Sequence, residues 1–194
     1  MAYCTLAQVR SYLGIGSTEI ADDVLISALI VRAQQAIDTH CDRKFEAASD
    51  STRYFDVGAD TEGRTLWIDE DLCAITTVTN GDSSSTVITA SQYTTIPRND
   101  TPYYGIRILS SSSKMWEYDD DPEGALSIAG KWAYSTSAPA DVVHACVRLV
   151  AFLYRQKDTS ADSDRPILTD AGVTIMPSSL PNDVRQILAP YRRL

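Results

Sequence analysis

Two segments with the repeat of an amphipathic helix flank a long block of different texture. The first, 22–43, carries apolar residues three and four positions apart, and the second, 139–157, shows the same stripe. Between them, residues 52–134 are rich in Thr, Ser, aromatic and β-branched residues, with turn signals such as Asn80-Gly81-Asp82. This order predicts an α+β fold, in which a small antiparallel β domain is inserted into a helical core.

The predicted helical core has three main helices and a C-terminal arm that ends in a short helix. Thr5 is a good N-cap for the first helix and Gly14 a stop, and Pro139 fits the first turn of the third. The expected strands are Arg53–Val57, Thr65–Ile68, Ile75–Thr79, Thr86–Thr89, Gln92–Thr95, Ile106–Ser110 and Leu126–Tyr134. The predicted parts are 1–51 (N-terminal helical part of the core), 52–134 (inserted β-rich domain), 135–157 (third core helix) and 158–194 (linker and C-terminal docking arm).

The charge of the chain is concentrated in its middle. The 194 residues have a formal charge of -9; residues 52–134 carry 6 basic and 13 acidic side chains, whereas residues 135–194 carry 7 and 6. Because a grip on nucleic acid needs clustered Lys and Arg, this balance argues against a nucleic-acid-binding protein, and against adsorption to an anionic membrane. No apolar run approaches the roughly 18 to 20 residues of a membrane span, and we see no signal peptide.

Four cysteines stand far apart, without the spacing of a zinc site: Cys4, Cys41, Cys73 and Cys146. Two of them fall on apolar helical stripes, which indicates core packing in a reducing cytosol rather than a metal site. His40 and His144 lie in predicted helices with no nucleophile motif beside them, so we expect satisfied helix side chains rather than a catalytic base. We therefore predict no catalytic residue, no metal and no cofactor.

Acidic clusters and aromatic residues leave two alternatives open. Asp69-Glu70-Asp71 and Asp119-Asp120-Asp121 could gather Mg²⁺ or Ca²⁺, but neither has EF-hand spacing, and charge runs in turns are usually solvated. The aromatic residues could stack on a sugar, although packing in the core or against another subunit is the favoured interpretation. These aromatic residues are Trp67, Tyr103, Tyr104, Trp116, Trp132 and Tyr134.

The C-terminal segment Pro181–Leu194 combines apolar side chains with three arginines. It follows a small, polar stretch, Asp158–Asp164, that predicts a mobile linker, and an extended or hairpin segment at Ile167–Met176. The segment starts as a capped helix that Pro190 should stop. Two interpretations stay open: the helix docks back on its own core, or it docks on a partner as an amphipathic segment does in a groove.

Taken in order, several of these runs resemble the head–tail connector, or adaptor, proteins of tailed bacteriophages and prophages, in particular longer members with a β insertion. The resemblance covers most of the chain and carries no catalytic signature. It rests on Thr5–Gly14, Asp22–Ile26, Ala36–Asp38, Cys41–Phe45, Thr52–Asp56, Leu66–Asp69, Ile75–Val78, Gln92–Thr94, Pro139–Val142 and Leu153–Asp158.

The resemblance implies a non-enzymatic structural protein of the virion, made in the host bacterial cytoplasm. Family members form a homo-oligomeric ring, typically a dodecamer, beneath the portal protein at the head–tail interface. The ring extends the DNA channel and joins the capsid to a stopper or tail protein. Packaged double-stranded DNA passes through without specific binding, and no membrane is involved. The alternatives are another neck component (a stopper or tail-completion protein), a glycan- or receptor-binding β module, and a metal-dependent hydrolase.

Two groups of site residues follow from this reading. In several family members the C-terminal arm docks on the portal, which the resemblance carries over to Pro181, Val184, Arg185, Ile187, Leu188, Tyr191, Arg192, Arg193 and Leu194. Deleting 181–194 should then remove portal attachment and spare the fold. Because an acidic lining repels phosphate at about Debye-length range, we expect Asp119, Asp120 and Asp121 to face the channel or its rim.

Overall fold

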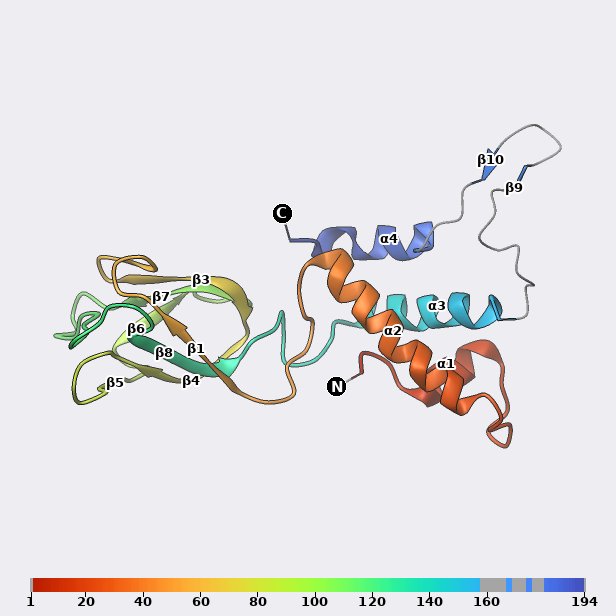
Figure 1. The fold of residues 1–194 in the computed structure, drawn as a ribbon, viewed down its shortest axis with the longest axis horizontal. Helices are drawn as coiled ribbons and strands as arrows, with labels where there is room; N and C mark the ends of the chain where they lie inside the picture. The colour runs from red at the N-terminus through yellow and green to blue at the C-terminus, as the bar shows by residue number, and fades with distance from the viewer. Residues whose placement is uncertain (1, 158–166, 169–173, 176–179, 194) are drawn as a thin grey trace. The chain divides into compact units, whose positions relative to one another are not determined.

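The computed structural model describes residues 2–157, 167–168, 174–175 and 180–193 (Figure 1). The chain divides into two compact units, which we call the helical unit and the β unit. The helical unit comprises Ala2–Asp42 together with Pro139–Leu194, and the β unit comprises Arg43–Ala138. The predicted α+β fold, with helices before and after an inserted antiparallel β part, is confirmed.

In its described residues the helical unit has four α-helices: α1 (Leu6–Leu13), α2 (Asp23–Cys41), α3 (Ala140–Arg155) and α4 (Asn182–Leu188). Local chemistry sets their ends. The Thr5 hydroxyl accepts a hydrogen bond from the Gln8 N–H at 3.2 Å and so caps α1, which Gly14 ends with a φ of 74°. The helical structure does not end abruptly before Pro190. α4 is followed by one 3₁₀ turn, η1 (Ala189–Tyr191), which contains this proline.

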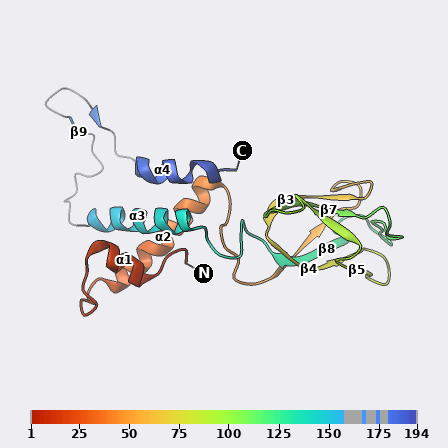
Figure 2. The ribbon, with the colours of Figure 1, turned by 180° about the vertical axis from the view of Figure 1, so that it is seen from behind.

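Each helix buries one apolar stripe. The stripe of α2 is the predicted one, and α4 lies alongside α3 in both views (Figures 1 and 2). Burial of one such side chain contributes about 1.5–3 kcal/mol, so the common core stabilises four helices that are far apart in sequence. The core side chains, each at most 5% exposed, are Val9, Ile26, Ile30, Ala33, Ile37, Cys41, Val142, Ala145, Cys146, Leu149, Val150, Val184 and Leu188.

The β unit contains two four-stranded antiparallel sheets. The first has the order β1 (Ser51–Phe55), β8 (Leu126–Lys131), β4 (Ala74–Thr79) and β5 (Val87–Ile88). The second has the order β2 (Thr61–Glu62), β3 (Thr65–Leu72), β7 (Tyr103–Ile108) and β6 (Tyr93–Ile96). Each of the seven predicted strands overlaps one of these, and only the two-residue β2 was not expected.

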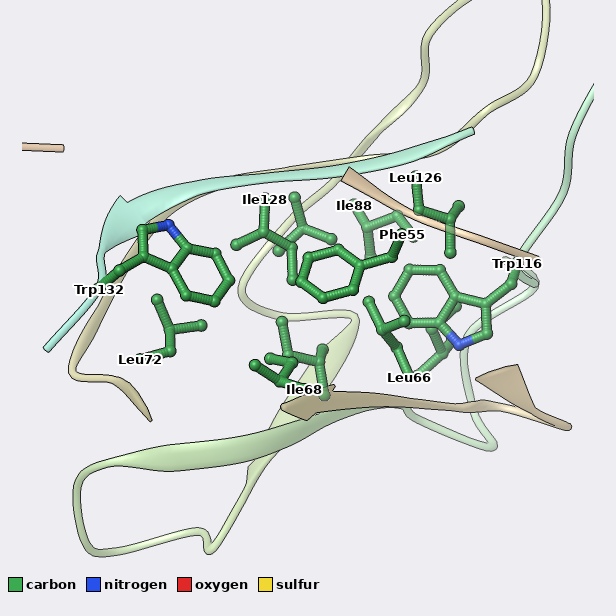
Figure 3. Close-up of a cluster of buried hydrophobic side chains, with 12 residues drawn as sticks. Phe55, Leu66, Ile68, Leu72, Ile88, Trp116, Leu126, Ile128 and Trp132 are labelled. Atoms are coloured by element: carbon green, nitrogen blue, oxygen red, sulfur yellow. The ribbon is translucent and has the colours of Figure 1, made fainter. Parts of the chain in front are cut away.

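Apolar side chains from both sheets fill the centre of the β unit (Figure 3). Phe55 of β1 and Ile128 of β8 meet Ile68 and Leu72 of β3, as the alternation of each strand dictates. The Phe55 ring stacks on Trp132, with 5.9 Å between the ring centroids. Since both sheets contribute to one core, the β unit has a hydrophobic interior of its own.

The chain passes from one sheet to the other at Cys73, between β3 and β4. Close to this crossing, Gly130 of β8 faces the backbone of β4. A Cβ atom at this position would lie 2.2 Å from the Ala74 carbonyl oxygen, so the close approach of the two strands requires glycine.

Two short strands, β9 (Ile167–Leu168) and β10 (Thr174–Ile175), pair in antiparallel fashion within the segment Ile167–Met176, for which the sequence predicts an extended or hairpin structure; its residues 169–173 and 176 lie outside the described ones. The predicted linker Asp158–Asp164 and the terminal Leu194 lie outside the described residues.

Candidate interaction surfaces

The C-terminal segment packs on its own helical unit. Val184 and Leu188 are fully buried, and polar contacts fix both ends of the described segment on the helical unit. Arg148 of α3 pairs with Asp183, and the Arg193 N–H donates to the Cys41 carbonyl at 2.9 Å. Of the two interpretations that the sequence left open, docking on its own core is therefore the one present in the structure.

The outer face of this segment is basic. Arg185 and Arg192 are exposed, and Arg192 lines a hollow of about 550–600 Å³ with Leu180 and His40. Burial, together with the nearby charges of Arg192 and Arg185, lowers the pKa of His40 below its usual value. His40 is thus held neutral beside two fixed positive charges.

A second hollow, which we call the α1/α3 groove, runs between α1 and α3 and has a volume of about 550 Å³. Tyr12 and His144 meet within it edge to face, with 6.4 Å between their centroids. None of its described lining residues carries a formal charge at neutral pH: they are Ala7, Gln8, Ser11, Tyr12, Ala140, Val143, His144 and Val147.

Apart from Arg32, the exposed side chains of α2 are uncharged. Val24 is 84% exposed and Val31 56% exposed, and the exposed Ala28 and Gln35 lie between and beyond them on the same side of the helix. Positions seven and four residues apart share one face of an α-helix, so these four side chains form a continuous strip, which we call the α2 ridge. Sequence reasoning missed this surface, although both valines stand outside the buried stripe of α2.

Asp119, Asp120 and Asp121 are all exposed, in the loop that precedes β8. The Asp119 N–H donates to the Gly81 carbonyl at 3.1 Å, which holds one end of the loop. A side-chain hydrogen bond between Asp121 and Glu123 lowers the pKa of Asp121 and raises that of Glu123. The three aspartates are therefore available at the surface of the β unit.

The other acidic cluster is not a solvated loop tip, contrary to the sequence prediction, because it belongs to β3. Asp71 is 5% exposed, although it alternates with the core residue Leu72, and it lies 3.5 Å from the Arg43 guanidinium, which stacks over Tyr134. Glu70 pairs with Arg53 at 3.2 Å on the outside. Among the residues that the structure describes, no group of three or more His, Cys, Asp or Glu side chains is arranged to hold a metal ion.

Aromatic and sulfur side chains mostly serve packing. Trp116 and Trp132 lie in the β core, whereas Trp67 is 47% exposed. All four cysteines are buried free thiols, which confirms the prediction of core packing. The sulfurs of Cys4 and Cys146 lie 3.4 Å apart, and this contact, together with burial, raises the pKa of the Cys146 thiol.

The family profile described as "HCP: Head completion protein" matches residues 2–194, essentially the whole chain. The chain belongs to the head completion protein family. It is thus a structural protein of virion head completion and not an enzyme.

Solved structures share the fold of this head completion protein. A chain of "Neck of empty GTA particle computed with C6 symmetry" aligns with a TM-score of 0.58 and 16% identity, covering 97% of this chain and 89% of that one. A chain of "Neck of native GTA particle computed with C12 symmetry" aligns with a TM-score of 0.57 and 17% identity, covering 97% and 88%. A third, from "Virion of native gene transfer agent (GTA) particle", gives a TM-score of 0.55, 17% identity and 97% and 89% coverage. A search of curated proteins found no match.

These findings confirm the resemblance predicted from the sequence at the level of family and fold. Within the described part of this head completion protein, no helix has both the length and the apolar character to span a membrane.

Proposed function

We propose that this head completion protein is the head–tail adaptor, a ring beneath the portal that extends the DNA channel and joins the capsid to the tail. The observation that carries the proposal is the alignment of 97% of the chain, helical and β units alike, with a protein of a neck assembly computed with C12 symmetry. That parallel supports a dodecameric ring of this chain. A ring also requires uncharged faces for neighbouring subunits, and the α2 ridge and the α1/α3 groove supply two.

The exposed acidic loop fits a channel that DNA passes without binding. We place Asp119, Asp120 and Asp121 toward the lumen or its rim, where negative charge repels phosphates over roughly a Debye length, about 8–10 Å at physiological salt. Replacing all three with Asn should change DNA retention or infectivity while the ring still assembles. Unchanged titre and unchanged packaged DNA would contradict the lumen placement.

The C-terminal segment is the proposed portal contact, but through its basic outer face. Since Val184 and Leu188 are buried in the helical unit, deleting 181–194 should destabilise that unit instead of removing attachment alone. Charge reversal of Arg185 and Arg192, both exposed, should weaken attachment to the portal and leave the helical content unchanged. Copurification of each variant with portal protein measures the effect.

One experiment tests the proposal as a whole. Particles assembled without this chain should carry portals to which neither stopper nor tail attaches, and adding the purified chain should place a ring of density directly on the portal. Electron micrographs in which the added chain binds only after another neck protein would instead assign it to a stopper or tail-completion position.

A further inference from the structure

The α2 ridge is an unusual surface for a chain with 22% charged residues. Its members Val24, Ala28, Val31 and Gln35 are uncharged over about three turns, with the exposed Arg32 beside them. Two exposed valines on such a strip leave apolar area in water, which a partner of similar character would cover. The ridge is convex, because a single helix carries it.

The α1/α3 groove has the complementary properties. It is a shallow hollow, its described lining contains no Asp, Glu, Lys or Arg, and none of these lining residues lies on α2. The ridge and the groove are therefore different surfaces of the same unit. A surface that fits a different surface of an identical copy produces head-to-tail association, which closes into a ring when the rotation allows.

We propose that the α2 ridge of one copy of this chain seats in the α1/α3 groove of the next copy. This inference rests on the ring of the proposed function and names the surfaces that hold its subunits together. The occupant of the groove is a second copy of the chain, since the ridge exposes two valines, the described lining of the groove contains no Asp, Glu, Lys or Arg, and an exposed Arg32 beside the ridge has an exposed Asp141 beside the groove as its counterpart.

The charges at the ends of the two surfaces give the contact a direction. Arg32 is exposed one position beyond Val31 and forms no ion pair with any residue in the described ranges. Asp141 is exposed at the first turn of α3, beside the groove. When the ridge lies antiparallel to α3, Arg32 comes opposite Asp141 and Val24 comes opposite Val147. The spans agree, since eight residues of α2 and six of α3 rise about 12 and 9 Å, a difference that an arginine side chain bridges.

Cysteine cross-linking in assembled particles tests the proposal. Ala28→Cys places a thiol at the centre of the ridge, and Ser11→Cys places one in the groove; both sites are exposed, while the native cysteines are buried. With a short bis-maleimide, the double variant should give a ladder of covalent oligomers up to the ring size. A mixture of the two single variants should give dimers only, and each single variant alone should give monomers.

The matched control is Val87→Cys combined with Ser11→Cys, because Val87 is a similarly exposed valine in the β unit. Cross-linking of Ala28→Cys to itself, or a ladder as strong in the control, would overturn the proposed contact. So would the absence of a ladder in particles whose micrographs show a ring. Absence of any ring with the unmodified chain is a different result, because it would overturn the adaptor function itself.

Charge reversal tests the direction of the contact. Arg32→Glu should reduce the ladder of the double variant several-fold, because it sets two acids against each other, and adding Asp141→Arg should restore it. Failure of the second change to restore the ladder would contradict the antiparallel arrangement.

Discussion

The two units of this chain differ in how the chain builds their hydrophobic cores. The β unit is one continuous stretch, Arg43–Ala138, with a closed core between two sheets and an acidic surface of 8 basic and 15 acidic residues. The helical unit is assembled from both ends of the chain, with 9 basic and 11 acidic residues, and exposes Val24 and Val31. The self-contained part thus carries most of the net negative charge, -7 against -2, and the part built from both ends carries the α2 ridge and the α1/α3 groove.

The unfolding of the two units can be followed separately because they have different spectroscopic signals. All three tryptophans, Trp67, Trp116 and Trp132, belong to the β unit, so tryptophan emission reports on that unit alone. The helical circular dichroism signal reports on the helical unit, which contains all four α-helices.

The largest effect is expected from Leu188→Ala. Leu188 is fully buried in the helical unit, and truncation of such a side chain typically costs about 2–5 kcal/mol. The helical signal should be lost at a lower temperature or urea concentration, while the tryptophan transition stays in place. Gln186→Ala, an exposed change on the same helix, is the control and should leave both transitions unchanged. An equal shift of both signals by Leu188→Ala would show that the units unfold as one.

Gly130→Ala should produce the reverse pattern. The added methyl group meets the Ala74 carbonyl oxygen, and overpacking of this kind costs about 1–3 kcal/mol, so the tryptophan transition should shift and the helical one should not. Gly16→Ala is the matched glycine control, because its nearest neighbour is the flexible end of Glu19 at 3.4 Å. A neutral Gly130→Ala would contradict the close approach of β8 and β4.

A smaller effect concerns acid stability of the helical unit. Asp22, ahead of α2, accepts hydrogen bonds from Lys157 and Tyr154, which lower its pKa below the ordinary 3.8. A carboxyl group with a depressed pKa in the folded state contributes stability above its unfolded pKa and loses it as the pH falls through the folded value. Asp22→Asn should therefore be less stable than the unmodified chain at pH 7, and the difference should narrow as the pH falls below the ordinary value of 3.8.

The helical signal, followed during thermal unfolding at several pH values, measures this difference. Glu19→Gln removes a neighbouring exposed carboxylate and should keep the pH dependence of the unmodified chain. A gap between Asp22→Asn and the unmodified chain that does not narrow as the pH falls below 3.8 would contradict the assigned contacts.

The smallest expected effect concerns the rate at which a reagent modifies the cysteine thiols. Because all four cysteines are buried, a thiol reagent should modify the native chain slowly. At a urea concentration that unfolds only the helical unit, Cys4, Cys41 and Cys146 should react while Cys73 of the β unit stays protected. Mass spectrometry of the labelled peptides gives the order, and early labelling of Cys73 would reverse the assignment.

The sequence predicted most of this fold because local patterns decide most of its elements. The capping box at Thr5, the stripe of α2 and the alternation within the strands are all set by near neighbours. The periodic stripe of the C-terminal helix showed which face is buried but not what covers it, since covering α3 or a partner leaves the same pattern. That choice required the tertiary structure.

Surface assignments were harder to predict for the same reason. Asp71 reads as part of a solvated acidic run, yet it is buried beside Arg43, a pairing between residues 28 positions apart that no local rule contains. Val24 and Val31 did carry a local signal, because they fall outside the core stripe of α2, and that signal marks the surface assigned here to subunit contact. The acidic residues Asp119–Asp121 and the basic residues of the C-terminal segment stay predictions about partners.

The two ends of the β unit lie side by side. Glu46 pairs with Ser135 in a β-bridge, and the Tyr134 N–H donates to the Lys44 carbonyl at 2.8 Å. A segment whose entry and exit meet can be lengthened, shortened or exchanged in evolution without redirecting the helices that it interrupts. The β unit therefore has the geometry of an exchangeable inserted domain. Protein engineers could use the same junction to insert other domains between the helices.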